Sequence, residues 1–358
     1  MNKIRRELTR AGMKFALNYP RVVPDKIAKA IFRSWNSCQR DFAAAAFATN
    51  DARPAPLPPL KLLDLSCTSG FGENVHPDVL YVPEGFGPGK WTYLMTCTPL
   101  PQGVEYFENP EFLVSMDGID WKVPEGGLSP LISPPDDWIG YNSDPILLLE
   151  NGELNLFYRE CRLDSQGAVI SLNRLKTHNG LIWSKKQTVL SFRRNVKDVS
   201  ILMSPSIVNI NSEYYLWYVW ADSGKPLNIY RYRSKDLNSW SCYECVELSG
   251  LPKNEAPWHL DISCLRDNAL LMALCSIPDG QILNKRIVFL SSVDNGLKWT
   301  YHPEVLNNGA YNFGANSLYR AALVLNSPDM LLYYSGQDME NHWSMSVIPL
   351  NNILPSIK

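Results

Sequence analysis

The stretch SMDGIDW at residues 115–121 is a polar turn that ends in tryptophan, and the chain repeats this pattern three more times. The other copies read THNGLIW at 177–183, SKDLNSW at 234–240 and SVDNGLKW at 292–299. Their tryptophans (Trp121, Trp183, Trp240 and Trp299) follow one another at intervals of 62, 57 and 59 residues. A period of this size indicates a structure built from stacked or radially arranged repeats.

Each repeat contains short runs with the two-residue period of β-strands. The clearest are KWTYLMTCT at 90–98, LNLFYRE at 154–160, EYYLWYVW at 213–220, NALLMALCS at 268–276 and MLLYYSG at 330–336. Five units of about four antiparallel strands, arranged radially, predict an all-β fold, a five-bladed β-propeller. The fifth unit is too short for a full fourth strand, so we expect LKLLDLS at 60–66 to supply it. Closing the ring in this way removes an open sheet edge.

The N-terminal region differs from the rest in charge and in period. Residues 1–40 carry a net charge of +8, whereas the remainder carries −10. Apolar residues recur at three- and four-residue steps, as in Ile4, Leu8, Ala11 and Phe15, which predicts amphipathic helices. The proline-rich stretch ARPAPLPPL at 52–60 ends any helix. We therefore predict a basic helical extension and linker over residues 1–59, and a propeller over 60–358. The helices would pack on the acidic propeller, or contact a membrane surface or another protein.

Composition argues against several other classes of protein. The propeller is net acidic and the basic region is small, so nucleic-acid binding is not expected. No apolar run approaches the ~20 residues of a membrane span, and charges interrupt the N-terminus where a signal peptide would need an apolar core. The single CxxC pair, Cys242 and Cys245, does not make a zinc site. Scattered cysteines fit a reducing compartment, so we expect a cytoplasmic location.

Polar residues stand directly before the first strand of each unit, as in ENVHPDVLY at 73–81. In a propeller, the start of the first strand and the end of the second face one end of the central channel. A single funnel should therefore collect the polar residues at these positions and in the loop EYFENPEF at 105–112. They are His76, Asp78, Glu108, Asn109, Asn142, Asp144, Arg159, Glu160, Trp220, Trp258, His259, Asp261 and Asn316.

With this architecture, the Asp-Pro unit starts and the repeated turns, residues 62–350 resemble the five-bladed propeller glycosidases of glycoside hydrolase families 43, 32 and 130. The resemblance implies a general base at the start of blade one and an orienting aspartate at the start of blade two, which Asp78 and Asp144 match. It also implies a glutamate as general acid in blade three, where this chain has Met203. Glu160 and Glu108 are the first candidates for the missing acid, followed by Asp261 and Glu255.

These residues have alternative interpretations. Asp78 and Asp144 could cap turns, His76 and His259 could bind a central ion or hold a carboxylate, and Trp220 and Trp258 could be core residues or sugar-stacking platforms. No cofactor is required, although a central calcium ion is compatible with the pattern. The leading hypothesis is hydrolysis of a poly- or oligosaccharide. The alternatives are a non-catalytic glycan-binding propeller and a phosphorylase or transferase with an anion site near Arg159, Arg162 and His259.

Overall fold

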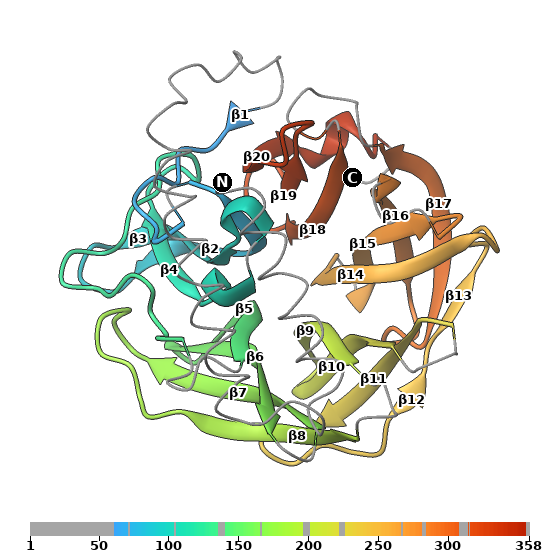
Figure 1. Ribbon diagram of the computed structural model, residues 1–358, viewed down its shortest axis with the longest axis horizontal. Helices are drawn as coiled ribbons and strands as arrows, with labels where there is room; N and C mark the ends of the chain where they lie inside the picture. Colours follow the sequence, from blue (N-terminus) through green and yellow to red (C-terminus); the bar gives the residue numbers. More distant parts are fainter. Residues whose placement is uncertain are drawn as a thin grey trace, which may run out of the picture.

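The protein is a ring of five β-sheets around a central channel, as the computed structural model shows (Figure 1). The structure describes residues 61–70, 72–103, 105–134, 140–164, 167–195, 201–221, 226–265, 268–280, 284–307, 314 and 316–355. The all-β five-bladed propeller is therefore confirmed. The helical extension predicted for residues 1–59 lies outside the described residues. Within them, no helix is long and apolar enough to cross a membrane.

Each blade is an antiparallel sheet whose first strand lies nearest the channel (Figure 1). Blade 1 contains β2 (Asn74–Phe86), β3 (Trp91–Pro99) and β4 (Glu111–Ser115), with the short 3-10 helices η1 (Pro101–Gly103) and η2 (Glu105–Phe107) after β3. Blade 2 contains β5 (Gly140–Glu150), β6 (Glu153–Asp164), β7 (Gly167–Thr177) and β8 (Gln187–Asn195). Blade 3 contains β9 (Ile201–Ile210), β10 (Glu213–Ala221), β11 (Asn228–Ser234) and β12 (Glu244–Cys245).

Blade 4 carries one additional strand, and blade 5 is completed by the other end of the chain. Blade 4 contains β14 (Glu255–Cys264), β15 (Leu270–Pro278), β16 (Arg286–Ser292) and β17 (Lys298–Leu306), with β13 (Glu247–Ser249) parallel to β17. Blade 5 contains β18 (Ser317–Val324), β19 (Leu331–Gln337) and β20 (Trp343–Pro349), followed by η6 (Leu350–Asn352). Its fourth strand is β1 (Lys61–Leu62), which pairs with β20. The predicted closure of the ring is confirmed.

The repeated turns owe their sequence to backbone capping. In the first, the Ser115 hydroxyl accepts the N–H of Gly118 at 3.0 Å, and Asp117 Oδ1 accepts two further N–H groups, of Ile119 and Asp120, at 2.9 Å each. The equivalent serine or threonine and aspartate or asparagine do the same in the other three turns. The tryptophan that follows packs between sheets, most completely at Trp299. These hydrogen bonds join residues that are close together in the chain, so the turn can be recognised from the sequence.

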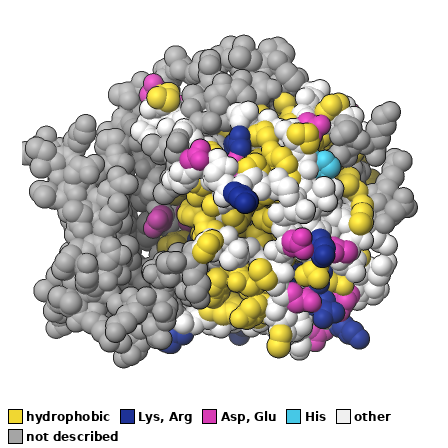
Figure 2. Space-filling model, turned by 90° about the vertical axis from the view of Figure 1, so that its right-hand side faces the viewer, with side chains coloured by type: hydrophobic (Ala, Val, Ile, Leu, Met, Phe, Trp, Pro, Cys, Tyr) yellow, Lys and Arg dark blue, Asp and Glu magenta, His cyan; other side chains and the backbone are white. Residues whose placement is uncertain are grey.

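The core consists of separate apolar layers between neighbouring blades. The largest joins blades 3 and 4 around Trp217 and Trp299, whose rings meet edge to face at 6.3 Å. Another joins blades 5 and 1 around Tyr333 and Met345, where Leu63 and Leu65 of the closing segment are buried. On the face drawn in Figure 2, hydrophobic side chains gather near the centre, and acidic and basic side chains lie together beside them. The blades are thus held to one another mainly by apolar packing.

A β-bulge interrupts the inner strand or its partner near the channel in all five blades. In blades 1 to 3 the bulge contains a residue followed by proline and held at positive φ, namely His76 at 54°, Asp144 at 49° and Ser204 at 49°. Positive φ is uncommon for residues other than glycine, although aspartate and histidine tolerate it better than most. Such strained bulges concentrate at functional sites because they redirect a side chain.

Candidate functional site

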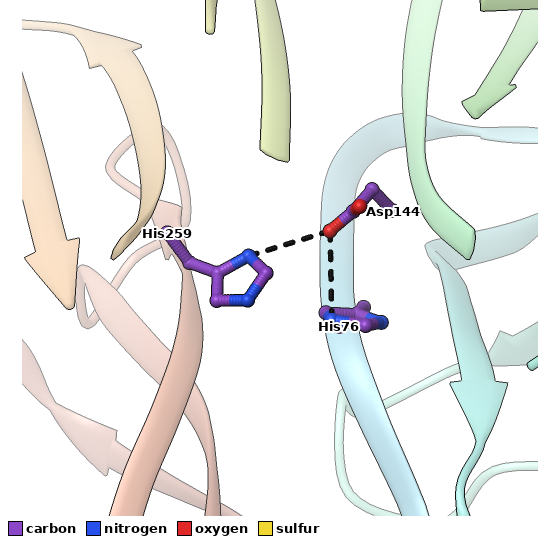
Figure 3. Close-up of side chains that lie close together, drawn as sticks. All are labelled: His76, Asp144 and His259. Atoms are coloured by element: carbon purple, nitrogen blue, oxygen red, sulfur yellow. Dashed lines mark ion pairs between the residues drawn. The ribbon is translucent and has the colours of Figure 1, made fainter. Parts of the chain in front are cut away.

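Two imidazoles meet one carboxylate at the centre of the ring. Asp144 Oδ1 lies 3.5 Å from His76 Nε2 and 3.3 Å from His259 Nδ1. The three side chains come from the inner strands of blades 2, 1 and 4, and both rings point toward the carboxylate (Figure 3). All three are buried, at 3% exposure or less. Among the residues that the structure describes, these three form a possible metal-binding group, because one ligand atom from each lies within 4.8 Å of the others.

Burial and neighbouring charges set the protonation states of this cluster. Burial lowers the pKa of His259, and it lowers that of His76 well below the ordinary value, so both rings are neutral at neutral pH. Burial alone would raise the pKa of Asp144, but the Arg159 guanidinium and the two histidines hold it well below its usual range. Neutral imidazole and ionised carboxylate are the forms that bind metal ions.

The atoms that face one another lack hydrogen-bond partners, although they are buried. No hydrogen bond of good geometry joins His76 Nε2, Asp144 Oδ1 or either ring nitrogen of His259 to another group, although His259 and Asp144 are close enough to interact. Separations of 3.3 and 3.5 Å exceed the roughly 2.7–2.9 Å of a charge-assisted hydrogen bond. They match the spacing of about 3.3 Å between ligands bound at roughly 2.0–2.1 Å in a tetrahedral zinc site. Buried polar groups without partners are costly, so these atoms fit a metal ion better than they fit one another.

A second set of side chains fixes the orientation of His76 and Asp144. His76 Nδ1 lies 2.8 Å from the Thr98 hydroxyl, so Nε2 is the nitrogen that faces the centre. Asp144 Oδ2 lies 3.0 Å from Arg159 Nε, which leaves Oδ1 for the cluster. Arg159 also donates to the Ser143 hydroxyl at 2.7 Å. Partners of this kind orient metal ligands and raise their basicity.

An acidic and amide-bearing loop forms one wall of the site. Glu108 is buried, and its carboxyl is close enough to interact with the charges of Asp144 and Arg159. Burial raises the pKa of Glu108 well above its ordinary value, and repulsion from Glu105 adds to the shift. Next to it, Asn109 Oδ1 accepts a hydrogen bond from Asn142 Nδ2 at 2.9 Å, which links blades 1 and 2. Glu108 is thus a buried carboxyl with a raised pKa that interacts with the charge of Asp144.

Two more carboxyls lie one step further along the inner strands. Asp78 Oδ2 accepts the N–H of Leu147 at 2.6 Å, and Asp261 Oδ2 accepts the N–H of Leu323 at 2.8 Å. The fully buried Arg320 lies 3.9 Å from Asp78 Oδ1. Burial, together with repulsion from Asp261, raises the pKa of Asp78 to about 7 despite this cation. Each aspartate ties its own blade to the inner strand of the next.

Most of the other predicted site residues make their contacts away from the cluster, and Trp258 is the exception. Glu160 is paired with Arg162 at 2.8 Å and Lys186 at 2.7 Å, on the opposite face of β6 from Arg159. Glu255 pairs with Arg286. Asn316 bonds Gln337 at 3.0 Å within blade 5. Trp258 meets the His259 ring edge to face at 5.7 Å, whereas Trp220 belongs to an aromatic group with Phe192 and Tyr218.

Sequence reasoning missed three residues of the site. Tyr319 packs its ring against His259 at 4.4 Å and His76 at 5.1 Å, and Tyr141 lies 3.4 Å from Arg159. Arg320 is close enough to interact with both Asp78 and Asp261. Its signal was an arginine inside the apolar run SLYRAALV at 317–324, because a buried cation requires an acidic partner. Nothing in the sequence distinguishes Tyr319 and Tyr141 from core tyrosines.

A curated protein is similar to this chain in sequence. No family model matches the chain. An A type blood N-acetyl-α-D-galactosamine deacetylase from Flavonifractor plautii is 24% identical over 266 residues, or 63% of this chain and 34% of the relative. The match therefore spans about a third of the relative's length.

Solved structures share the architecture. An N-acetylgalactosamine deacetylase from F. plautii, in complex with blood group B trisaccharide, superposes with a TM-score of 0.71 at 17% identity, over 85% of this chain and 97% of that one. A family 32 β-fructofuranosidase from Bombyx mori gives 0.58 at 15% identity, over 87% and 65% of the two chains. At these identities the likeness shows a shared fold, the five-bladed β-propeller. Enzymes of different chemistry share this fold.

Proposed function

We propose that this protein is a metal-dependent hydrolase that removes the acetyl group from an N-acetylated sugar. The observation that carries the proposal is the cluster of His76, Asp144 and His259, whose facing atoms are buried without hydrogen-bond partners. Two imidazole nitrogens and one carboxylate favour a divalent transition-metal ion, whereas calcium takes oxygen ligands. The deacetylase from F. plautii supports the choice of an N-acetyl group.

The residues of the site fit hydrolysis of an amide. A bound divalent ion would supply Lewis-acid activation of water and of the acetyl carbonyl. Asp144 is held in place by Arg159, and His76 by Thr98, so the ligands are preorganised. Addition of water to the carbonyl carbon releases a proton, and breaking the C–N bond requires one at the departing amine nitrogen. Glu108, a buried carboxyl whose pKa is raised, would donate that proton.

The test combines metal content with product analysis. We expect the purified protein to retain about one equivalent of a transition metal, and to release acetate from N-acetylgalactosamine or N-acetylglucosamine glycosides. Chelation should abolish acetate release, and added zinc, cobalt or manganese should restore it. Tight metal binding without release of acetate or sugar would identify a binding protein instead. A protein that neither binds a transition metal nor depends on one contradicts the proposal.

The Glu108→Gln variant tests the proton donor. Glutamine preserves the shape of the side chain but cannot donate the carboxylic proton, so we expect the turnover rate to fall about 10²-fold, with metal content unchanged. Steady-state kinetics and metal analysis measure the two effects. The matched control is Glu125→Gln, on an exposed turn, which should leave both unchanged. Wild-type turnover in Glu108→Gln would remove Glu108 from the mechanism.

Glycoside hydrolysis is the second candidate, and one observation favours it. Asp78 and Asp261 are both buried, and burial together with repulsion from Asp261 raises the pKa of Asp78 to about 7; hydrolysis of a glycoside needs one protonated and one ionised carboxyl. Both carboxyls, however, accept backbone N–H groups of the next blade. Release of reducing sugar that resists chelation and is lost in Asp78→Asn would select this reaction over deacetylation.

A further inference from the structure

An aromatic pocket of about 310 Å³ lies between blades 2 and 3, apart from the metal-ligand cluster. Phe192 of β8 belongs to blade 2, and the remaining lining residues belong to blade 3 or the segments that follow its strands. They are Tyr218, Trp220, Pro226, Asn228, Tyr230, Tyr232 and Tyr243. The volume is near the lower end of the range for small-molecule sites, which suits a single sugar ring rather than a large ligand.

Strand register places this pocket near the rim that carries the candidate site. Trp220 pairs with Leu202, close to the start of β9 and to the bulge at Ser204. This bulge is the blade-3 counterpart of those that hold His76 and Asp144. Because β10 and β11 are the second and third strands from the channel, the pocket lies outward from the funnel. A chain of sugars that enters the funnel could therefore extend across blade 3.

The pocket combines aromatic faces with hydroxyl groups. Tyr218 is stacked with Tyr232 at 5.4 Å, and Tyr243 meets the rings of Tyr230 and Tyr232 edge to face at 5.3 and 6.2 Å. Tyr243 is 62% exposed, so a large aromatic surface remains in contact with solvent. The Tyr218 hydroxyl donates to that of Tyr232, whose own proton is then directed elsewhere.

Among the residues that the structure describes, those that line the pocket carry no charged side chain, which limits the class of ligand. These residues offer no cation to a phosphate, a uronate or another anion. An organic cation would interact with the rings, but none of the described lining residues is a carboxylate that would balance its charge. A pyranose ring has an apolar face that stacks on aromatic rings, and a rim of hydroxyls that can bond tyrosine and asparagine.

We propose that this pocket is a second carbohydrate subsite, which binds one neutral pyranose ring of an oligosaccharide. The subsite deepens the proposed function, because it makes the substrate an extended glycan rather than a monosaccharide. Binding in the pocket needs neither the metal ligands nor turnover. The subsite can therefore be tested even if the chemistry proposed for the funnel is wrong.

The test measures equilibrium binding in a variant that cannot turn over the ligand. The probes are methyl α-D-galactoside, methyl N-acetyl-α-D-galactosaminide and the blood group B trisaccharide, titrated into His259→Ala and observed by saturation-transfer NMR and by fluorescence. Tyr243→Ala added to this background should weaken binding about tenfold, as expected when one stacked ring is lost. Val293→Ala, a truncation of an exposed apolar side chain in blade 4, is the control and should change nothing.

A second substitution separates a sugar from other ligands. Tyr232→Phe keeps the ring but removes a hydroxyl, so it should weaken sugar binding severalfold and leave an apolar or cationic ligand unaffected. Tyr301→Phe in blade 4 is the matched control. Sugar binding that is equal in Tyr243→Ala and the parent overturns the subsite, as does binding of tetramethylammonium in preference to every sugar. A wild-type protein that releases no acetate but still binds sugar in the pocket would contradict only the deacetylation proposed for the funnel.

Discussion

The His259→Ala variant is expected to purify as a folded propeller that contains no transition metal and releases acetate at least about 10³-fold more slowly than wild type. His259 Nδ1 faces Asp144 Oδ1, and its removal leaves one imidazole and one carboxylate, too few for a stable site. Metal-ion catalysis contributes several kcal/mol to lowering the barrier, and each 1.36 kcal/mol corresponds to a factor of about ten in rate. Elemental analysis and kinetics of acetate release measure both effects.

The matched control is His178→Ala. The His178 side chain is 75% exposed and lies near Glu153 at the outer end of blade 2, so its loss should change neither metal content nor rate. Circular dichroism should show the same strand content in both variants. Full metal occupancy in His259→Ala would mean that the cluster is not the binding site, and unchanged turnover in a metal-free His259→Ala would exclude a metal from the reaction.

Arg320→Met should produce the largest loss of stability of any single substitution at the channel. The guanidinium is fully buried, lies 3.9 Å from Asp78 Oδ1 and interacts with the charge of Asp261, and both carboxyls remain fixed to backbone N–H groups when it is removed. Methionine fills a similar volume but leaves the two buried carboxyls without a cation. Breaking a buried ion pair in this way typically lowers the free energy of unfolding by about 3–5 kcal/mol. Denaturant unfolding at neutral pH measures the change.

Arg162→Met is the control for this experiment. Arg162 pairs with Glu160 but its side chain is 47% exposed, so we expect a change within about 0.5 kcal/mol. Replacing Asp78 by asparagine in the Arg320→Met background should restore part of the lost stability, because only one buried carboxyl then lacks a cation. An Arg320→Met protein as stable as wild type would show that the two aspartates do not depend on this cation.

The fold could be predicted because its determinants are local and repeated. Each turn of the Ser115–Trp121 type is a set of hydrogen bonds within a few residues, so its sequence is readable without knowledge of the rest of the chain. Ring closure could be predicted from the short fifth unit alone. The central site was predictable only as a collection of rim residues, since the contacts of Asp144 with His76 and His259 cross the channel.

The limits of the sequence are clearest at β6. Side chains alternate along a strand, so only one of the neighbours Arg159 and Glu160 can face the funnel, and the sequence does not show which one does. In the structure Arg159 reaches Asp144, and Glu160 pairs with Lys186 instead. The cation Arg320 was missed for a different reason: its acidic partners are supplied by blades 1 and 4, and no local pattern reveals them.

The bulges at His76, Asp144 and Ser204, where φ is positive, allow the side chains at the centre of the ring to vary independently of the strands that form it. The flanking strand ladders hold this backbone conformation, so the side chain at each bulge can change while the strands on either side keep their pairing. Evolution can therefore exchange the reaction of such a frame through a few positions, without rebuilding a blade. In the third blade the hydroxyl of Ser204 forms hydrogen bonds with the backbone of Leu260. The side chain at this bulge therefore makes a structural contact. Replacing Ser204 by histidine would turn this third position into a potential ligand, which makes the propeller a natural starting point for engineered metal chemistry.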